Sequence, residues 1–243
     1  MWNRLFIKEK IVFKDNNLAD FDQEELDIIN QVQSYTMTSK ERLVSLIRSI
    51  KYLQKNRIEG DFVECGVWKG GSVMAMILAI RNFPEIERKI WLYDTFQGMT
   101  PPKPEDLQFD GLPAKTLLDK DKGKKSNIWA VSSLEEVKSN IGSLNYSKEL
   151  LEFVQGPVEE TIPKSEIGKI SLLRLDTDWY ESTKLELEIL FPKLVKGGIL
   201  IIDDYGHWKG CKKAVDEYLD SIDHPLFLSR IDYTGRLIVK NCD

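Results

Sequence analysis

Three aspartates in the sequence stand directly after two apolar runs. Asp176 ends the run KISLLRLD (169–176), and Asp203 and Asp204 end the run GGILIIDD (197–204). If the two runs are neighbouring strands of a sheet, the three carboxylates meet at one edge, where they repel one another unless they protonate or bind a cation. Carboxylate oxygens favour Mg²⁺, Mn²⁺ or Ca²⁺. The pattern therefore predicts a hard-metal site, although Asp203 and Asp204 alone also fit a simple turn after a strand.

A glycine-rich segment, ECGVWKGGS (64–72), offers a second kind of site. Gly66 and Gly70 allow backbone to approach a ligand closely. Trp68 stands where the dinucleotide pattern G-x-G-x-x-G has its second glycine, which weakens an NAD interpretation. Glu64 can receive an ammonium group and would repel a pyrophosphate. The alternative is a strand–helix turn that binds no ligand.

A further carboxylate, Asp94, ends the next apolar run, KIWLYD (89–94). A carboxylate in this position can accept two O–H hydrogen bonds from a ribose diol, although a plain loop carboxylate fits equally well. An ammonium site beside a ribose site, with no phosphate site, describes S-adenosylmethionine better than NAD.

The elements that must position these residues are strands alternating with helices. Thr38-Ser39-Lys40-Glu41 is typical of a capping box that opens a helix, and the tail FLSRIDYTGRLIVK predicts a hairpin around Thr234-Gly235. The alternation predicts an α/β fold with a mainly parallel sheet, helices on both faces and an antiparallel C-terminal hairpin, with ligands at the carboxyl ends of the strands. The expected strands cover 62–65, 89–94, 149–156, 169–176 and 197–204.

The length of 243 residues fits one large domain. We place this domain at residues 38–243, preceded by a helical arm at 1–37 that contains FDQEELDIINQVQ. The stretch 101–127 is rich in proline and lysine and has no clear period. A long loop of this kind is expected to be either a lid over the site or a solvent-exposed loop.

The composition limits the partners of the protein. A net charge of −5 argues against nucleic acid. Three scattered cysteines, in no zinc spacing, indicate a reducing, cytoplasmic environment. The N-terminal residues MWNRLFIKEK lack the apolar stretch of a signal peptide, and no run is long enough to cross a bilayer, so no membrane partner is expected.

Several segments in order along the chain carry a family resemblance, and the two that contain Asp176 and Asp203-Asp204 are the most specific. The chain resembles the macrocin O-methyltransferase (TylF-type) family, which methylates sugar hydroxyls in antibiotic biosynthesis. The matching segments are YTM (35–37), GDFVECGVWKGG (60–71), LYDTFQGM (92–99), SSLEEVKSN (132–140), LRLDTDWYEST (173–183), FPKLVKGGILIIDDY (191–205) and CKKAVDEY (211–218).

The resemblance implies a class I methyltransferase Rossmann-like fold with a seven-stranded sheet, S-adenosylmethionine as methyl donor and Mg²⁺ as metal. It implies that Asp176, Asp203 and Asp204 are the metal ligands and that Asp178 is the general base. A homodimer or larger homo-oligomer is expected.

The same resemblance assigns the cofactor site. Glu64 and Gly66 match the methionine end, Asp94 matches the ribose site, and Ser132 and Ser133 lie where the family contacts adenine. We also assign Met37, Gly70 and Ser72 to this site, from the matching segments that contain or adjoin them.

The predicted reaction is methyl transfer to a hydroxyl of a sugar-containing small molecule. Metal-chelated vicinal hydroxyls lose a proton more easily, and Asp178 can accept it. An ordinary aspartate, with a pKa of about 3.9, is a weak base, so His207 is the rival candidate. Thr177, His207 and Trp208 depart from the family pattern around the acceptor, which leaves a nucleotide sugar, a glycan end and a glycosylated natural product open.

Other classes of protein fit parts of the pattern. An NAD(P)-dependent oxidoreductase on a similar sheet is disfavoured by the missing glycine and by Glu64. A metal-dependent hydrolase would not need the glycine turn. A protein that binds S-adenosylmethionine but catalyses no reaction would not need Asp178 and a full set of metal ligands.

Overall fold

The computed structural model describes residues 18–83 and 87–242. These residues contain a seven-stranded sheet in the order β3-β2-β1-β4-β5-β7-β6. Strands β1 to β5 are parallel, whereas β7 runs antiparallel to both β5 and β6, which confirms the predicted parallel sheet with a C-terminal hairpin. The strands are β1 (Asp61–Cys65), β2 (Ile90–Asp94), β3 (Leu151–Gln155), β4 (Ile170–Leu175), β5 (Leu194–Ile202), β6 (Ser229–Arg230) and β7 (Arg236–Val239).

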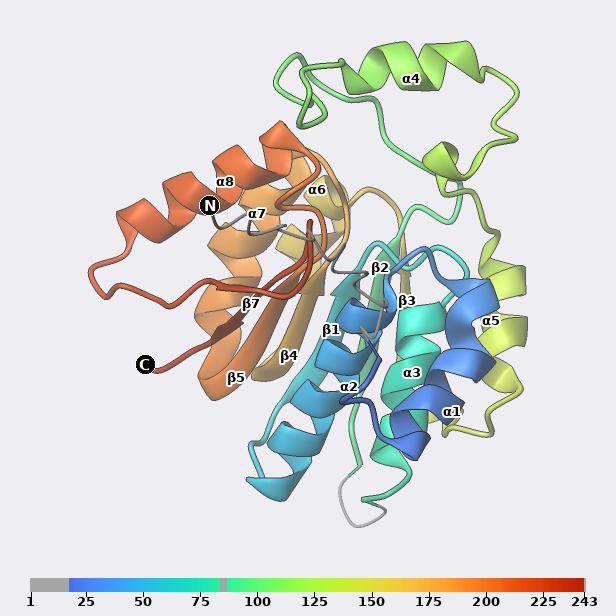
Figure 1. Ribbon diagram of the computed structural model, residues 1–243, viewed down its shortest axis with the longest axis vertical. Coiled ribbons are helices and arrows are strands. Elements are labelled where there is room, and N and C mark those ends of the chain that lie inside the picture. The colour runs from blue at the N-terminus through green and yellow to red at the C-terminus, as the bar shows by residue number, and fades with distance from the viewer. Residues whose placement is uncertain (1–17, 84–86, 243) are drawn as a thin grey trace, which may run out of the picture.

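Helices cover both faces of the sheet (Figure 1). Helices α1, α2, α3 and α5 lie on one face, and α6, α7 and α8 lie on the other, each face with its own buried apolar cluster. The helices are α1 (Gln23–Val32), α2 (Lys40–Lys55), α3 (Gly71–Ile80), α4 (Ala114–Lys120), α5 (Leu134–Gly142), α6 (Val158–Thr161), α7 (Tyr180–Leu190) and α8 (Lys209–Ser221), with 3-10 turns at Gln33–Tyr35, Asn127–Trp129, Lys148–Leu150, Ile162–Lys164 and Phe191–Lys193. No helix among the described residues combines the length and apolar character needed to cross a membrane.

The topology decides where a ligand can bind. The strand order reverses between β1 and β4, because β2 and β3 lie on one side of this pair and β5 on the other. In open sheets a crevice forms outside the carboxyl ends of the strands at such a point. The ends of β1, β2, β4 and β5, where the sequence places its carboxylates, therefore surround one crevice.

The N-terminal segment enters this crevice rather than standing apart from it. Residues 1–17 of the predicted arm lie outside the described residues. Helix α1 buries Ile28, Ile29 and Val32 in the apolar cluster that it shares with α2 and α3. Helix α2 is capped by Ser39, whose side chain accepts from the backbone N–H of Arg42, one residue later than predicted.

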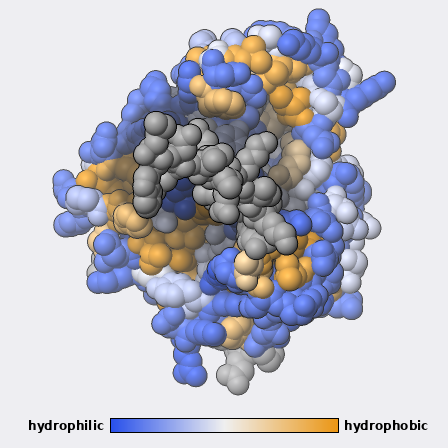
Figure 2. All heavy atoms as spheres, viewed as in Figure 1, coloured by the Kyte–Doolittle hydropathy of each residue, from blue (hydrophilic) through white to orange (hydrophobic). Residues whose placement is uncertain are grey.

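The segment 101–127 forms an ordered lobe that carries α4 (Figure 1). Its contact with the body depends on Asp106, which is fully buried and accepts from the backbone N–H of Lys103 at 2.7 Å and of Tyr180 at 2.8 Å. Tyr180 is the first residue of α7, so the carboxylate also lies at a helix N-terminus, where negative charge is favoured. Figure 2 shows hydrophobic residues gathered at the base of this lobe.

We predict that Asp106→Ala releases the lobe. The change leaves the buried N–H of Tyr180 and the N–H of Lys103 without this acceptor, so the free energy of unfolding should fall by about 1–3 kcal/mol. Urea denaturation measures this loss, and limited trypsin digestion should cut the lysine-rich stretch 120–125 faster than in the wild type. Asp110→Ala, at an exposed position of the same lobe, is the control, and equal effects of the two changes would contradict the anchoring role.

Candidate functional site

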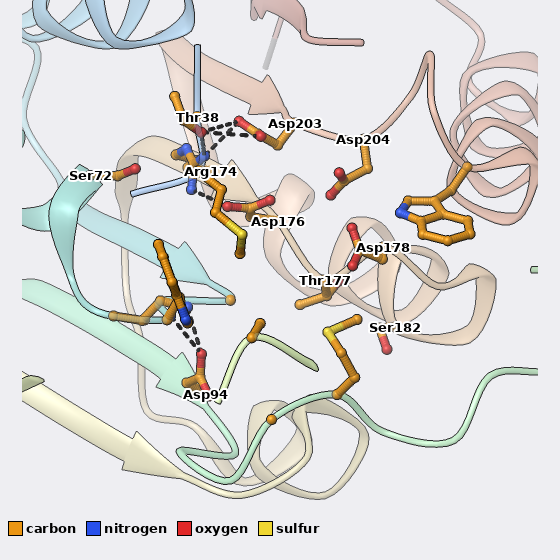
Figure 3. A pocket seen from close by; sticks show the side chains of 18 of the residues that line it. Thr38, Ser72, Asp94, Arg174, Asp176, Thr177, Asp178, Ser182, Asp203 and Asp204 are labelled. Carbon is orange, nitrogen blue, oxygen red and sulfur yellow. Dashed lines mark hydrogen bonds and ion pairs between the residues drawn. The ribbon is translucent and has the colours of Figure 1, made fainter. Parts of the chain in front are cut away.

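A pocket of about 430 Å³ lies at the carboxyl ends of the strands (Figure 3). Its walls come from the segment before α2, the turn after β1, the ends of β2, β4 and β5, and the lobe of α4. The predicted site residues that line it are Met37, Gly66, Ser72, Asp94, Asp176, Asp178, Asp203, Asp204 and His207.

Three carboxylates in the pocket converge on one point. One oxygen from each of Asp176, Asp178 and Asp204 lies within 4.8 Å of the other two, and the three side chains point toward one another in Figure 3. One oxygen of Asp204, Oδ2, is buried without a hydrogen-bond partner. Such a cluster of oxygens, with a buried lone pair to spare, suits a hard divalent cation.

The acid–base properties of the cluster follow from its burial. Burial raises the pKa of Asp178 to about 7, against the effect of its hydrogen bonds with Asp204 and Trp208. Burial also raises the pKa of Asp204 well above its usual range, and the charges of Asp178 and Asp176 add to the rise. Too few positive charges lie near these carboxylates to balance their negative charge. A cation that entered would therefore be bound, and it would lower the pKa values of Asp178 and Asp204 again.

Asp203 does not belong to this cluster, which corrects the predicted set of three. Its carboxylate accepts from Arg174 Nη2 at 2.5 Å and from Thr38 Oγ1 at 3.2 Å, and it also pairs with Arg42. The side chain points toward these partners in Figure 3. Two guanidinium groups already neutralise Asp203, so Asp178 takes its place as the third converging carboxylate.

A buried arginine organises the acids around the pocket. Arg174 lies one residue before the carboxyl end of the apolar strand β4, with its side chain 2% exposed. Its Nη1 donates to Glu64 at 2.6 Å and to Asp176 at 2.8 Å, and its Nη2 donates to Asp203. The sequence analysis overlooked Arg174, although one arginine inside the run ISLLRL is a visible signal, because a buried charge requires partners.

Glu64 is buried behind the pocket rather than in its wall. Its Oε1 pairs with Arg174, while its Oε2 is buried and has no hydrogen-bond partner. Burial raises the pKa of Glu64 to about 7, although the charge of Arg174 opposes the rise. The unpaired oxygen is the one through which Glu64 can receive a further donor.

The glycine turn and Asp94 form a single unit. Asp94 accepts from the backbone N–H groups of Val67 at 2.7 Å, Trp68 at 3.1 Å and Phe96 at 2.6 Å. Gly66 has φ +84°, and a Cβ there would lie 2.0 Å from the carbonyl oxygen of Asp176. No other residue fits at position 66, and Asp94 fixes the shape of the turn whether or not it also binds a ribose.

Comparison with known proteins identifies the family. Residues 8–240 match the family described as macrocin-O-methyltransferase (TylF). A demethyldecarbamoylnovobiocin O-methyltransferase from Streptomyces niveus is 34% identical over 202 residues, which are 83% of this chain and 74% of the relative. The chain belongs to the macrocin-O-methyltransferase family. It is an O-methyltransferase, as predicted, and the oxidoreductase alternative is set aside.

Further relatives are similar to this chain in sequence and in fold. An O-methyltransferase from Streptomyces olivaceus that acts on a rhamnosyl tetracenomycin is 33% identical over 83% of this chain and 74% of its own. The structure of the O-methyltransferase NovP superposes with a TM-score of 0.74 at 33% identity, over 86% of this chain and 83% of that chain. The class I methyltransferase fold is thereby confirmed.

Three residues predicted for the cofactor site of the methyltransferase have local structural roles. Gly70 caps α3 with φ +88°. Ser133 caps α5, and Ser132 donates to Glu136 at 2.9 Å. None of them is among the residues that line the pocket, and the lobe instead contributes Asn127, Ile128 and Ala130.

His207 faces the lobe and the hairpin of the methyltransferase. Its Nε2 lies 3.1 Å from Nε2 of Gln108, and its Nδ1 is hydrogen-bonded to the hydroxyl of Tyr233. Burial lowers the pKa of His207, so the ring is neutral at pH 7. Both ring nitrogens already have partners, whereas Trp208, the next residue, bonds with Asp178.

We predict that Arg174→Met is among the most destabilising single changes in the protein. It leaves Glu64 and Asp203 buried without this cation, and breaking a buried ion pair typically costs about 3–5 kcal/mol. The deficit against the wild type should shrink as pH falls. Without the guanidinium the pKa of Glu64 rises further above its ordinary 4.5, and a raised carboxyl pKa destabilises the fold mainly at high pH.

Urea denaturation at pH values on both sides of about 6 checks this prediction. Lys115→Met is the control, because Lys115 pairs with Asp119 at the surface, with 72% and 55% of the two side chains exposed, and should lose less than about 1 kcal/mol. A loss for Arg174→Met as small as this, or one independent of pH, would rule out the role of Arg174.

Proposed function

We propose that the protein transfers the methyl group of S-adenosylmethionine to a hydroxyl of a sugar-containing small molecule, with a bound Mg²⁺ ion. The observation that carries the proposal is the convergence of Asp176, Asp178 and Asp204 within 4.8 Å beside the glycine turn. The printed names of the relatives support the acceptor class, since one acts on a rhamnosyl tetracenomycin and another on mycinamicin III.

The residues of the cluster fit a hard cation. All the donors are carboxylate oxygens, and Asp204 Oδ2 is buried without a partner, which is costly unless a cation or a donor arrives. Asp176 and Asp204 would hold the ion, with Asp178 facing it, and Asp203 would remain with its two arginines. When bound, Mg²⁺ polarises hydroxyl oxygens and lowers their pKa.

The pocket also fits the methyl donor. S-adenosylmethionine supplies the methyl group on a sulfonium with a good leaving group. On the protein side, Asp94 has acceptor capacity left on Oδ1 for a ribose hydroxyl, because that oxygen receives one backbone N–H and one long contact from Thr95. Glu64 Oε2 would receive the ammonium group, and Ser72 and Met37 line the pocket near its methionine end.

Asp178 is the proposed proton acceptor. Its carboxylate converges with those of Asp176 and Asp204, so it would lie beside a hydroxyl polarised by the ion, within the reach that proton transfer needs. His207 is the weaker candidate, because both ring nitrogens are already hydrogen-bonded.

Two features expected from the sequence stay predictions. One is the homo-oligomer and the other is the cytoplasmic location. The acceptor class, addressed below, rests on contacts around the mouth of the pocket.

We predict that the cation depends on Asp204 more than on Asp203. Asp204→Asn should weaken Mn²⁺ binding by at least roughly tenfold, a loss that even outer partners of metal ligands can cause, whereas Asp203→Asn should weaken it less. Electron paramagnetic resonance of free Mn²⁺ measures both affinities, with circular dichroism as the folding control. An equal loss in the two variants would restore the set of ligands first predicted, with Asp203 among them.

We predict that Asp178→Asn lowers kcat by roughly 10²–10⁴, the contribution of a general base. Binding of S-adenosylhomocysteine, measured by calorimetry, should be unchanged, because Asp178 does not hold the cofactor. A chelator should stop methyl transfer from labelled S-adenosylmethionine by the wild type, and added Mg²⁺ should restore it. Full activity of Asp178→Asn, or of Asp176→Asn with chelator present, would contradict this mechanism.

A further inference from the structure

An aromatic group that the reaction does not use stands at one side of the pocket. It consists of Phe109 from the lobe, His207 from the loop between β5 and α8, and Tyr233 from the turn between β6 and β7. The ring centroid of Phe109 lies 5.9 Å from that of His207 and 6.2 Å from that of Tyr233. His207 and Tyr233 line the pocket, while Phe109 is 60% exposed and Tyr233 is 51% exposed. The rings thus extend the pocket wall outward to the surface.

Backbone hydrogen bonds hold the three contributing segments together. The N–H of Lys209 donates to the carbonyl of Leu107 at 2.7 Å, and the N–H of Gly206 donates to the carbonyl of Thr234 at 2.9 Å. A Cβ on Gly206 would lie 2.1 Å from the carbonyl oxygen of Tyr233, so the loop and the hairpin are in close contact. The rings are therefore positioned before any ligand arrives, which reduces the entropy lost on binding.

The aromatic group adjoins the carboxylate cluster. The backbone N–H of His207 donates to the carbonyl of Asp204 at 3.0 Å, and only three residues separate the two positions, so their Cα atoms lie at most roughly 11 Å apart. A sugar whose hydroxyl reaches Asp204 would therefore place the substituent on its far side beside the rings of His207, Tyr233 and Phe109.

The polar atoms of the group are largely used within it. His207 bonds with Gln108 through one nitrogen and with Tyr233 through the other. What remains for a ligand is mainly ring surface, and exposed apolar rings of this kind mark binding sites when they adjoin a pocket. This favours a planar apolar substituent over a second sugar, which would need hydrogen-bond partners.

The charge of the pocket restricts the substituent further. Six carboxylates and two arginines line it, and both arginines, Arg42 and Arg174, are paired with Asp203. Even a bound divalent cation leaves the carboxylates in excess, so a diphosphate would be repelled. This disfavours a nucleotide sugar as acceptor.

We infer that Phe109, His207 and Tyr233 form a specificity site that stacks an uncharged aromatic group attached to the sugar that is methylated. The inference rests on the proposed function for the identity of the sugar site. It selects an aryl glycoside from the acceptor classes that the sequence left open. An offset or edge-to-face contact of this kind is worth roughly a threefold to tenfold change in affinity per ring.

The test compares phenyl and methyl glycosides of the same set of neutral sugars. Methyl transfer from labelled S-adenosylmethionine with Mg²⁺ gives kcat and KM for each pair. The phenyl glycoside should have a KM lower by roughly tenfold or more, and Phe109→Ala should reduce this advantage by roughly threefold to tenfold while leaving kcat and the methyl glycoside unaffected. Phe227→Ala is the matched control, because Phe227 is 82% exposed and does not line the pocket.

Several outcomes would overturn the inference. One is an equal KM for the two glycosides, and another is a Phe109→Ala variant that weakens both alike. A third is preferential use of a nucleoside diphosphate sugar in a manner that depends on Phe109, which would place a nucleobase on the rings. Better use of a disaccharide than of the phenyl glycoside would place a second sugar there.

A binding measurement separates this inference from the proposed function. If no glycoside of either form is methylated, the proposed function is contradicted. Calorimetric titration of the phenyl and methyl glycosides into wild type and Phe109→Ala, with S-adenosylhomocysteine and Mg²⁺ present, still decides the aromatic site. Tighter binding of the phenyl form that is lost in Phe109→Ala supports the site, and equal binding overturns it.

Discussion

The position of one buried guanidinium, that of Arg174, determines which carboxylates of this site are neutralised and which are not. Arg174 reaches from near the carboxyl end of β4 to Glu64 on β1 and to Asp203 after β5. A carboxylate buried without such a partner would be too costly to keep ionised. Because Arg174 and Arg42 neutralise Asp203, the charges left uncompensated are concentrated on the opposite side of the pocket. The buried guanidinium of Arg174 thus decides which carboxylates are left for the proposed metal ion.

Backbone conformation then sets the direction of the Asp178 side chain. Asp178 has φ +67°, a region that residues other than glycine seldom adopt, and the N–H of Trp179 closes a three-residue turn around it by donating to Thr177. Strain of this kind persists only where the surrounding structure enforces it. Here Asp106 and the lobe hold the start of α7 directly after the turn, so a contact remote from the chemistry fixes the direction of the proposed base.

The mainly parallel sheet and the rim of carboxylates could be predicted from the sequence, because both depend on apolar periodicity and on residues at strand ends. The partners of individual side chains could not. Asp176, Asp203 and Asp204 have the same chemistry and similar positions in their runs, and only the side-chain directions separate them. The cap of α2 is similar: the hydroxyl of Thr38 donates to Asp203 and accepts from Arg174, so Ser39 is left to cap the helix.

Two residues predicted for the cofactor site also have local roles that the sequence shows less clearly. Ser132 and Ser133 precede a helix, and a serine at such a position can satisfy the helix N-terminus, as Ser133 does here, while Ser132 donates to Glu136. The acceptor side was the least predictable, because Phe109, His207 and Tyr233 come from three segments that no sequence period connects. Strand ends hold the proposed chemistry, while loops surround the acceptor. Because the loops bear little of the fold, their residues can change and alter acceptor choice without disturbing the carboxylates.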